Sequence, residues 1–238
     1  MEQQKHDPFA SVRIPEYKYL MIGRFLFITG LRMMGTLVGW WIYELTNDPL
    51  AIGLVGLSEV IPAVSLALYA GHVIDLSEKR AMILRGVVLY FTCVLVLLLL
   101  SGQFTSSWLN NPQIAWCVYG VIFCTGIIRA FTGPVFGVLV ASIAPKEILA
   151  NATTWSQGVW LSASVTGHAA GGMLIALLGI NGTLVIIACL IAVAFFAMMQ
   201  LLPKPALNEP GEKKTWESVK EGISFVVKTK EILGALSL

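Results

Sequence analysis

The chain has 238 residues, of which 56% are hydrophobic and only 13% charged, and its formal net charge at pH 7 is +2. Soluble globular domains carry about 25% charged residues, so the composition excludes an ordinary water-soluble protein. The small net charge gives no reason to expect a nucleic-acid partner. The four cysteines lie in apolar runs without CxxC or histidine-rich spacing, and the sequence therefore predicts neither a metal site nor a cofactor.

The chain begins with a polar tail, residues 1–18, that has no apolar core of the signal-peptide kind. A helix that crosses a bilayer needs roughly 20 mostly apolar residues, and six later stretches meet that length. In chain order they are 19–43, 50–72, 82–101, 113–141, 152–178 and 181–202. We expect helices because lipid offers no hydrogen-bond partners to an unpaired backbone. Gly133 and Pro134 predict a bend or tilt in the fourth stretch.

The basic residues indicate how these stretches are oriented. The connections at 44–49, 102–113 and 179–182 contain no Lys or Arg. Arg24, Arg32 and Arg129 lie deep within predicted spans, Arg85 lies at the start of the third span next to the basic turn, and the other basic residues fall in the tails and in the alternate connections. The positive-inside rule therefore places the N-terminus and the segment after the sixth stretch in the cytoplasm.

The chain changes character after the sixth stretch. Residues 203–230 begin as a polar linker rich in Pro and Lys and continue as an amphipathic helix at the cytoplasmic interface. Residues 231–238 look like the opening of a seventh span that is cut off. The predicted organisation is thus an all-α membrane protein: a cytoplasmic tail (1–18), a six-helix transmembrane bundle (19–202), the linker and amphipathic helix (203–230), and the truncated span (231–238).

Ionisable side chains inside the membrane are costly and are functional candidates by default. Arg32 in the first stretch and Glu59 in the second fall at similar depth, about 5 Å apart along the membrane normal. We predict that they pair, either as a structural ion pair or as a coupling site. Arg24, two turns before Arg32, is predicted to extend its head group to the cytoplasmic surface.

The turn between the second and third stretches, "GHVIDLSEKR" (71–80), combines Gly71, Asp75, Lys79 and Arg80. It resembles the loop G-x-x-x-D-[RK]-x-G-[RK]-[RK] of the major facilitator superfamily. The resemblance implies a gating loop, in which the glycine lets helices approach closely and the aspartate pairs with bases or a helix end and latches one conformation. The alternative is a basic turn that sets topology without gating.

Two residues of this turn depart from the family pattern. Leu76 stands where a base is usual, and Glu78 stands where glycine is usual. Both departures weaken the gating role that the resemblance implies. The sequence therefore leaves two interpretations of this loop open, a latch and a turn that sets topology.

The fifth stretch contains "ASVTGHAAGGMLIALLG" (163–179), which resembles the antiporter motif of the same family. Gly167, Gly171 and Gly172 occupy glycine positions, and His168 replaces the proline. Small residues at helical spacing let membrane helices pack backbone to backbone, so we predict a tight contact here. Both a static contact and a sliding interface fit the pattern.

Further intramembrane candidates are Glu59, Arg129 and His168. Glu59 is the only carboxylate at mid-membrane depth, which makes it the candidate for reversible protonation. Arg129 occupies the position of an arginine that is associated with proton transfer in the resembled family. His168 either titrates or serves as a neutral hydrogen-bonding residue. Three aromatic residues either line a cavity or face lipid: Phe131, Phe136 and Trp160.

The segments 44–64 and 129–156 resemble bacterial facilitators of the enterobactin-exporter and macrolide-efflux kind. This resemblance implies the N-terminal half of a secondary transporter in a bacterial inner membrane that exports a drug- or siderophore-like molecule in exchange for protons. The implied partners are the small-molecule substrate, protons, the lipid bilayer and a second six-helix half, either a missing C-terminal half or another copy. The alternatives are an uptake symporter and a non-transporting half-bundle. No GxSxG, HExxH or pore-lining charge ring occurs, so neither an enzyme nor a channel is predicted.

Overall fold

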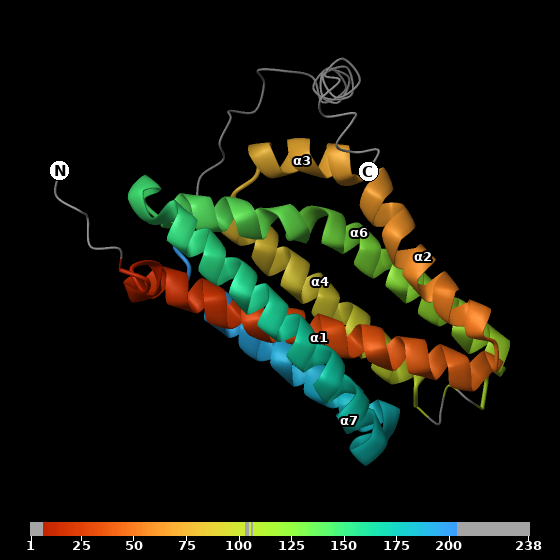
Figure 1. Cartoon of the computed structure of the whole chain (residues 1–238). Helices are drawn as coiled ribbons and strands as arrows, with labels where there is room; N and C mark the ends of the chain where they lie inside the picture. Colours follow the sequence, from red (N-terminus) through yellow and green to blue (C-terminus); the bar gives the residue numbers. More distant parts are fainter. Residues whose placement is uncertain (1–6, 103–104, 106, 204–238) are drawn as a thin grey trace, which may run out of the picture.

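The computed structural model describes residues 7–102, 105 and 107–203, and within these residues the chain is helical, without strands (Figure 1). The predicted amphipathic helix and truncated span fall within 204–238, which lies outside the described residues. The elements are η1 (Ser11–Arg13), α1 (Pro15–Thr46), α2 (Pro49–Ser65), α3 (Ala67–Leu76), α4 (Lys79–Leu100), α6 (Asn111–Ile143), η2 (Lys146–Ile148) and α7 (Leu149–Met199).

The turn between α1 and α2 follows from its sequence, "TNDP". Asn47 adopts the left-handed conformation (φ 51°, ψ 28°) and ends α1, as asparagine tolerates better than most residues. The Asp48 side chain then accepts a hydrogen bond from the Leu50 amide at 2.9 Å, and Pro49 begins α2 with its fixed φ. The chain therefore reverses direction within a few residues.

The second predicted span is bent. Pro62 lies inside α2, which ends at Ser65, and the axes of α2 and α3 differ by 54°. Proline lacks the amide hydrogen that would continue the helix and its ring crowds the preceding turn. The fourth predicted span also contains a proline, Pro134, yet α6 runs from Asn111 to Ile143 as one helix.

The fifth and sixth predicted spans belong to one element, α7, which is interrupted at Gly179 (φ 66°, ψ −173°). Along the part of α7 before Gly179, successive residues contact later and later residues of α1. After Gly179 they contact earlier and earlier residues of α1, so the two parts of α7 run in opposite directions. In chain order the neighbouring residues are Gly167 with Thr29, Gly171 with Met33, Ile191 with Gly30, and Met198 with Gly23. α7 is therefore a hairpin of two helices that packs on α1.

Several of these helices suit a membrane. By length and composition four helices in the described part of the chain can cross a bilayer, and the number rises to five if the bent pair α2–α3 is one span. α7 has 51 residues, more than twice the roughly 20 that one crossing needs. The number of crossings, six, stays a prediction.

The predicted cytoplasmic segments gather at one end of the bundle. Arg80 at the start of α4 donates to the carbonyl of Met199 at 2.8 Å, and the amide of Leu202 donates to Glu16 at 3.0 Å. At the opposite end, Ser101 hydrogen-bonds to Asn181. The alternation of basic and base-free turns therefore corresponds to the two ends of the bundle.

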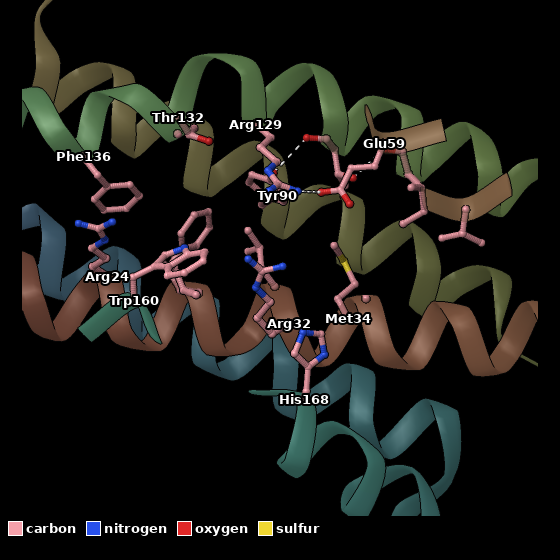
Figure 2. Close-up of a pocket in the computed structure, with 18 residues that line it drawn as sticks. Arg24, Arg32, Met34, Glu59, Tyr90, Arg129, Thr132, Phe136, Trp160 and His168 are labelled. Atoms are coloured by element: carbon pink, nitrogen blue, oxygen red, sulfur yellow. Dashed lines mark hydrogen bonds and ion pairs between the residues drawn. The ribbon is translucent and has the colours of Figure 1, made fainter. Parts of the chain in front are cut away.

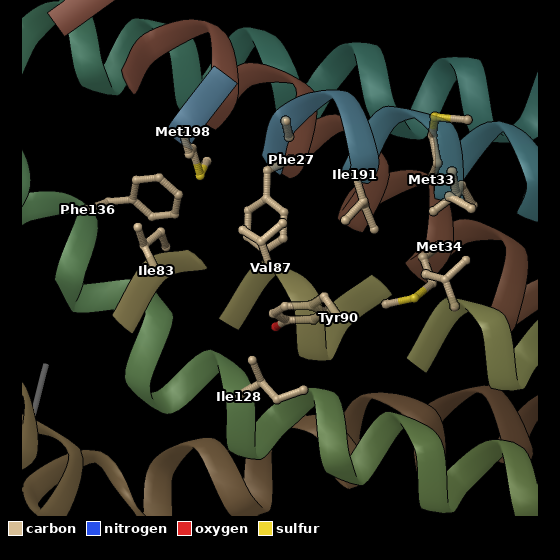
Figure 3. Packing of buried hydrophobic residues seen from close by; sticks show 14 of the residues in the cluster. Phe27, Met33, Met34, Ile83, Val87, Tyr90, Ile128, Phe136, Ile191 and Met198 are labelled. Carbon is tan, nitrogen blue, oxygen red and sulfur yellow. The ribbon is translucent and has the colours of Figure 1, made fainter. Parts of the chain in front are cut away.

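The core lies where α1 meets α4, α6 and α7 (Figure 3). Phe27 of α1 meets Tyr90 of α4 edge to face, with ring centroids 5.2 Å apart, and lies 6.2 Å from the ring of Phe136 on α6. Apolar burial of this kind fixes the rotation of α1 about its own axis. That rotation decides which α1 side chains face the neighbouring helices.

The predicted tight contact of the fifth span lies between α7 and α1, and it involves two of the three glycines. A Cβ at Gly167 would lie 2.6 Å from the Cβ of Arg32, and one at Gly171 would lie 3.1 Å from the Cα of Met33. A Cβ at Gly172 would meet nothing within 4 Å. Gly172 therefore takes no part in this contact.

We predict that Gly167→Ala destabilises the protein by about 1–3 kcal/mol, the usual cost of overpacking. The added methyl group has no room between α7 and α1. The free energy of unfolding in detergent micelles, followed by circular dichroism, measures the effect. Gly172→Ala is the matched control and should leave stability unchanged or slightly raised; an equal loss in both variants would contradict the packing described here.

Candidate functional site

A cavity of about 170 Å³ lies among α1, α2, α4, α6 and α7 (Figure 2). Its wall combines charged and aromatic side chains near the middle of the helices. Those that bear on its chemistry are Arg24, Phe27, Arg32, Glu59, Tyr90, Arg129, Phe136, Trp160 and His168. All four predicted intramembrane candidates are among them, although they come from four different helices.

Glu59 of α2 pairs with Arg129 of α6, not with Arg32. The Nη1 atom of Arg129 lies 2.8 Å from Oε1 of Glu59. The prediction of an Arg32–Glu59 pair was wrong, because equal depth along two helices does not say which faces meet. The side chain of Arg129 is 46% exposed and that of Glu59 is 34% exposed, so the pair is accessible at the wall of the cavity.

A glycine brings this pair together. Gly126 lies one turn before Arg129, and a Cβ there would lie 2.6 Å from Cγ of Pro62 and closer still to the carbonyl of Glu59. α6 therefore approaches the backbone of α2 at the level of Glu59, which places Arg129 beside the carboxylate. The sequence signal for this contact, a glycine three residues before an intramembrane arginine, is visible only once the partner helix is known.

Arg32 points into the cavity from α1 (Figure 2). Its guanidinium carbon lies 5.6 Å from the centre of the Trp160 ring, the geometry of a cation–π contact. Within the described ranges its guanidinium makes no hydrogen bond or ion pair. The positive charge therefore lies against an aromatic face, and no described residue provides a counter-ion.

Arg24 does not extend to the cytoplasmic surface as predicted. It lines the cavity, with its guanidinium carbon 5.1 Å from the centre of the Phe136 ring, and it donates a hydrogen bond to Ser156. Its Nε atom is buried without a hydrogen-bond partner among the described residues. Packing of Phe136 and α7 over the side chain keeps it inside the bundle.

The remaining polar side chains connect the helices around the cavity. Nδ1 of His168 on α7 lies 2.9 Å from the hydroxyl of Thr36 on α1, which agrees with a hydrogen-bonding role. The Tyr90 hydroxyl donates to the carbonyl of Thr125 at 3.0 Å. Among the described residues no group of three or more His, Cys, Asp or Glu side chains gathers to hold a metal ion.

The aromatic candidates separate into two places. Phe136 and Trp160 line the cavity, so the cavity alternative holds for them. Phe131 lies instead beside α4, in a pocket with Arg85, and its ring centroid is 6.3 Å from that of Tyr69.

Side chains of the turn at 71–80 cap the ends of neighbouring helices. The Lys79 side chain is 1% exposed, and its Nζ atom donates to the carbonyls of Ile74, Asp75 and Ser77 at the end of α3. A cation in this position also interacts favourably with the negative end of the helix dipole. Lys79 therefore holds the C-terminus of α3 against the N-terminus of α4.

Two other residues of the turn cap neighbouring helix ends. Glu78, which departs from the family pattern, accepts hydrogen bonds from the amides of Arg80 and Ala81 at 2.8 and 2.7 Å and so caps α4. Arg80 reaches the last turn of α7 through the carbonyl of Met199. The departure at Glu78 thus has a structural reason.

Gly71 makes no close helix contact, and the side chain of Asp75 forms no hydrogen bond or ion pair with the described residues, although its charge acts on nearby Lys79. A Cβ at Gly71 would meet nothing within 4 Å, so no helix of the described chain approaches closely there. The Asp75 side chain is exposed and accepts no hydrogen bond from the described residues. Both residues remain open on the outer face of α3.

The fold and the site together define a class: an all-helical membrane bundle with charged side chains around a cavity at mid-helix, as membrane transporters have. The family model of the Major Facilitator Superfamily matches residues 20–238. The chain belongs to this superfamily, whose members are membrane transporters. No curated protein sequence matches the chain significantly.

We predict that Lys79→Met lowers the free energy of unfolding by about 1–3 kcal/mol, because three carbonyls at the end of α3 lose a charged donor. Thermal unfolding in detergent micelles measures the change. Lys146→Met is the control, since Lys146 is exposed in the other basic turn. Equal stability of both variants would contradict the capping role.

Proposed function

We propose that the protein is a proton-coupled secondary transporter of a small amphipathic molecule, with Glu59 as the group that binds the proton. One observation carries the proposal: the Glu59–Arg129 ion pair forms part of the wall of a cavity at mid-helix. An ionisable pair at this depth is costly, and residues of this kind typically mark substrate pathways and proton relays. Its partial exposure gives both the proton and the substrate access to it.

The pair offers a two-state element. When Glu59 is ionised, it holds Arg129 and ties α6 to α2. When Glu59 binds a proton, the attraction between opposite charges is lost, and Arg129, which already lines the cavity, is left without a counter-charge. Protonation therefore changes both the charge of the cavity and the strength of the α2–α6 contact, as a switch that couples proton binding to a conformational change requires.

The proposal includes six crossings, a cytoplasmic N-terminus in a bacterial inner membrane, and a second six-helix half that completes the cavity. The observation in favour of a second half is an exposed apolar face of α2. Its large side chains include Leu57, Val60, Ile61 and Val64. Gly71 and Asp75 lie farther along the same open side, on α3, and in this proposal they contact the second half and form the latch.

Export by proton antiport is the direction that the resemblance to efflux facilitators supports. Uptake by proton symport is the second candidate, and one observation favours it. Among the described residues, the cavity wall has three guanidinium groups and one carboxylate. A substrate that this charge attracts gains, and does not lose, affinity when Glu59 is protonated, which is the relation that symport needs.

We predict that Glu59→Gln abolishes the dependence of transport on the pH gradient. Inside-out vesicles with an acidic lumen are supplied with radiolabelled benzenesulfonate or benzyltrimethylammonium, two aromatic ions too polar to cross lipid unaided. An antiporter accumulates the probe in the lumen, whereas a symporter releases preloaded probe. The variant should show neither movement, because its side chain cannot bind and release the proton.

Glu147→Gln is the matched control, since Glu147 is an exposed carboxylate in the turn before α7, and it should behave as the unmodified protein. Transport of either ion that responds to the gradient equally well in Glu59→Gln would refute the role of Glu59. Absence of gradient-driven movement of both ions in the unmodified protein would refute proton-coupled transport.

We also predict the sidedness of the turns. In a background with the four cysteines replaced by alanine, Asn110→Cys should react with an impermeant maleimide on intact cells. Lys146→Cys should react only after the membrane is permeabilised, because its turn carries a basic residue and lies at the other end of the bundle. Labelling of both positions from the same side would contradict the orientation.

A further inference from the structure

We propose that the cavity binds an organic anion built on an aromatic ring, with Arg32 and Arg24 as its recognition residues; this inference rests on the proposed function and names its substrate class. The charges of the wall are unequal. Among the described residues that line it are three arginines and one glutamate, a formal balance of +2. A cavity with this excess attracts a negatively charged ligand.

The excess charge belongs to Arg32 and Arg24. Arg129 already has the carboxylate of Glu59 as its partner. A guanidinium presents five N–H donors, yet Arg32 donates none of them to a described residue, and Arg24 donates only to Ser156 and leaves Nε buried and unpaired. Two incompletely paired cations inside a membrane protein are costly, and the oxygens of an acid group supply both the hydrogen bonds and the counter-charge.

The same two side chains point to an aromatic ligand. Each guanidinium lies over an aromatic ring, Arg24 over Phe136 and Arg32 over Trp160. The rings offer flat apolar faces beside the charges, so an acid group and a ring can be bound together. Figure 2 shows these four side chains directed into the same space between α1 and α6.

The size of the cavity agrees with a single ring. Its volume is about 170 Å³, close to the roughly 150 Å³ of an engineered protein cavity that holds benzene. Arg24 and Arg32 are eight residues apart on α1, so their backbones are separated by about 12 Å. A ring that carries one acid group therefore contacts one guanidinium directly, and a longer molecule spans both.

Ligands of other charge fit this wall less well. An organic cation meets two uncompensated guanidinium groups, and Glu59, the one carboxylate that described residues contribute to the wall, is already paired with Arg129. A neutral ligand brings no counter-charge to Arg32, and a neutral acceptor forms a weaker hydrogen bond with a guanidinium than a charged one does. The anion is the one class whose binding removes the charge excess.

The test compares two probes of nearly equal shape, benzenesulfonate, which is anionic, and benzenesulfonamide, which is neutral. Isothermal titration calorimetry of the 238-residue chain in lipid nanodiscs measures both affinities. We expect benzenesulfonate to bind about tenfold more tightly or better, as one charge-assisted hydrogen bond provides. Arg32→Gln should remove this preference and leave benzenesulfonamide unchanged, whereas Arg32→Lys, which keeps the charge, should retain part of it.

Arg85→Gln is the matched control, since Arg85 is an exposed arginine outside the cavity, and it should bind both probes as the unmodified chain does. Circular dichroism of each variant verifies that it is folded. Equal affinity for the two probes, loss of both affinities alike in folded Arg32→Gln, or no binding of benzenesulfonate would overturn the proposal.

The outcome is separate from that of the proposed function. Gradient-driven, Glu59-dependent movement of benzyltrimethylammonium without binding of benzenesulfonate would refute the anion and leave proton-coupled transport standing. Arg32-dependent binding of benzenesulfonate in a protein that moves neither ion would support the anion site and refute the transport proposal.

Discussion

A guanidinium group inside a membrane protein has to find a partner, and the whole cavity is arranged around this constraint. Three arginines project into the same space from two helices, and each is met by a side chain of another helix. In chain order the partners are Phe136 for Arg24, Trp160 for Arg32 and Glu59 for Arg129. These contacts tie α1, α2, α6 and α7 together at mid-helix, so the stability of the bundle and the charge of its cavity depend on the same groups.

Glycines bring the backbones close enough for these contacts. Gly126 lets α6 approach α2 beside Glu59, and Gly167 and Gly171 let the first part of α7 lie against α1. Side chains that follow such a glycine within one turn reach the neighbouring helix at a fixed angle, because backbone contact leaves little freedom for rotation. The close contacts therefore determine the positions of the charges, and the end caps formed by Lys79, Glu78 and Arg80 keep the helix ends in register.

The sequence predicts the helices, their order and the grouping of basic turns, since these depend on long apolar runs and on where charges lie between them. It cannot predict which faces meet. Arg32 and Glu59 lie at equal depth, but the rotation of each helix about its axis, which the apolar core fixes, brings Arg129 to Glu59 instead. The rotation of α1 is also the reason why Arg24 was wrongly predicted to reach the surface, since packing under Phe136 holds it inside. The bend after Pro62 and the continuity of α6 through Pro134 likewise depend on neighbouring helices that one proline alone does not reveal.

The charge of the cavity ties the kind of substrate to the direction of transport. With Glu59 ionised the three arginines and one glutamate sum to +2, and with Glu59 protonated they sum to +3. An anion in the cavity therefore binds more tightly to the protonated protein, and by reciprocity the bound anion favours protonation of Glu59. An anion bound in the cavity also competes with Glu59 for Arg129, and this competition too favours protonation of Glu59. If Glu59 binds the proton and the cavity binds an anion, as proposed above, proton and anion bind together, which is the relation of a symporter, whereas an antiporter needs a substrate that the proton displaces. A cation held by Glu59 would be such a substrate, but the two unmatched guanidinium groups oppose it. Recognition of an anion and export by proton antiport are therefore in tension in this cavity, and the wall as it stands favours the anion and symport.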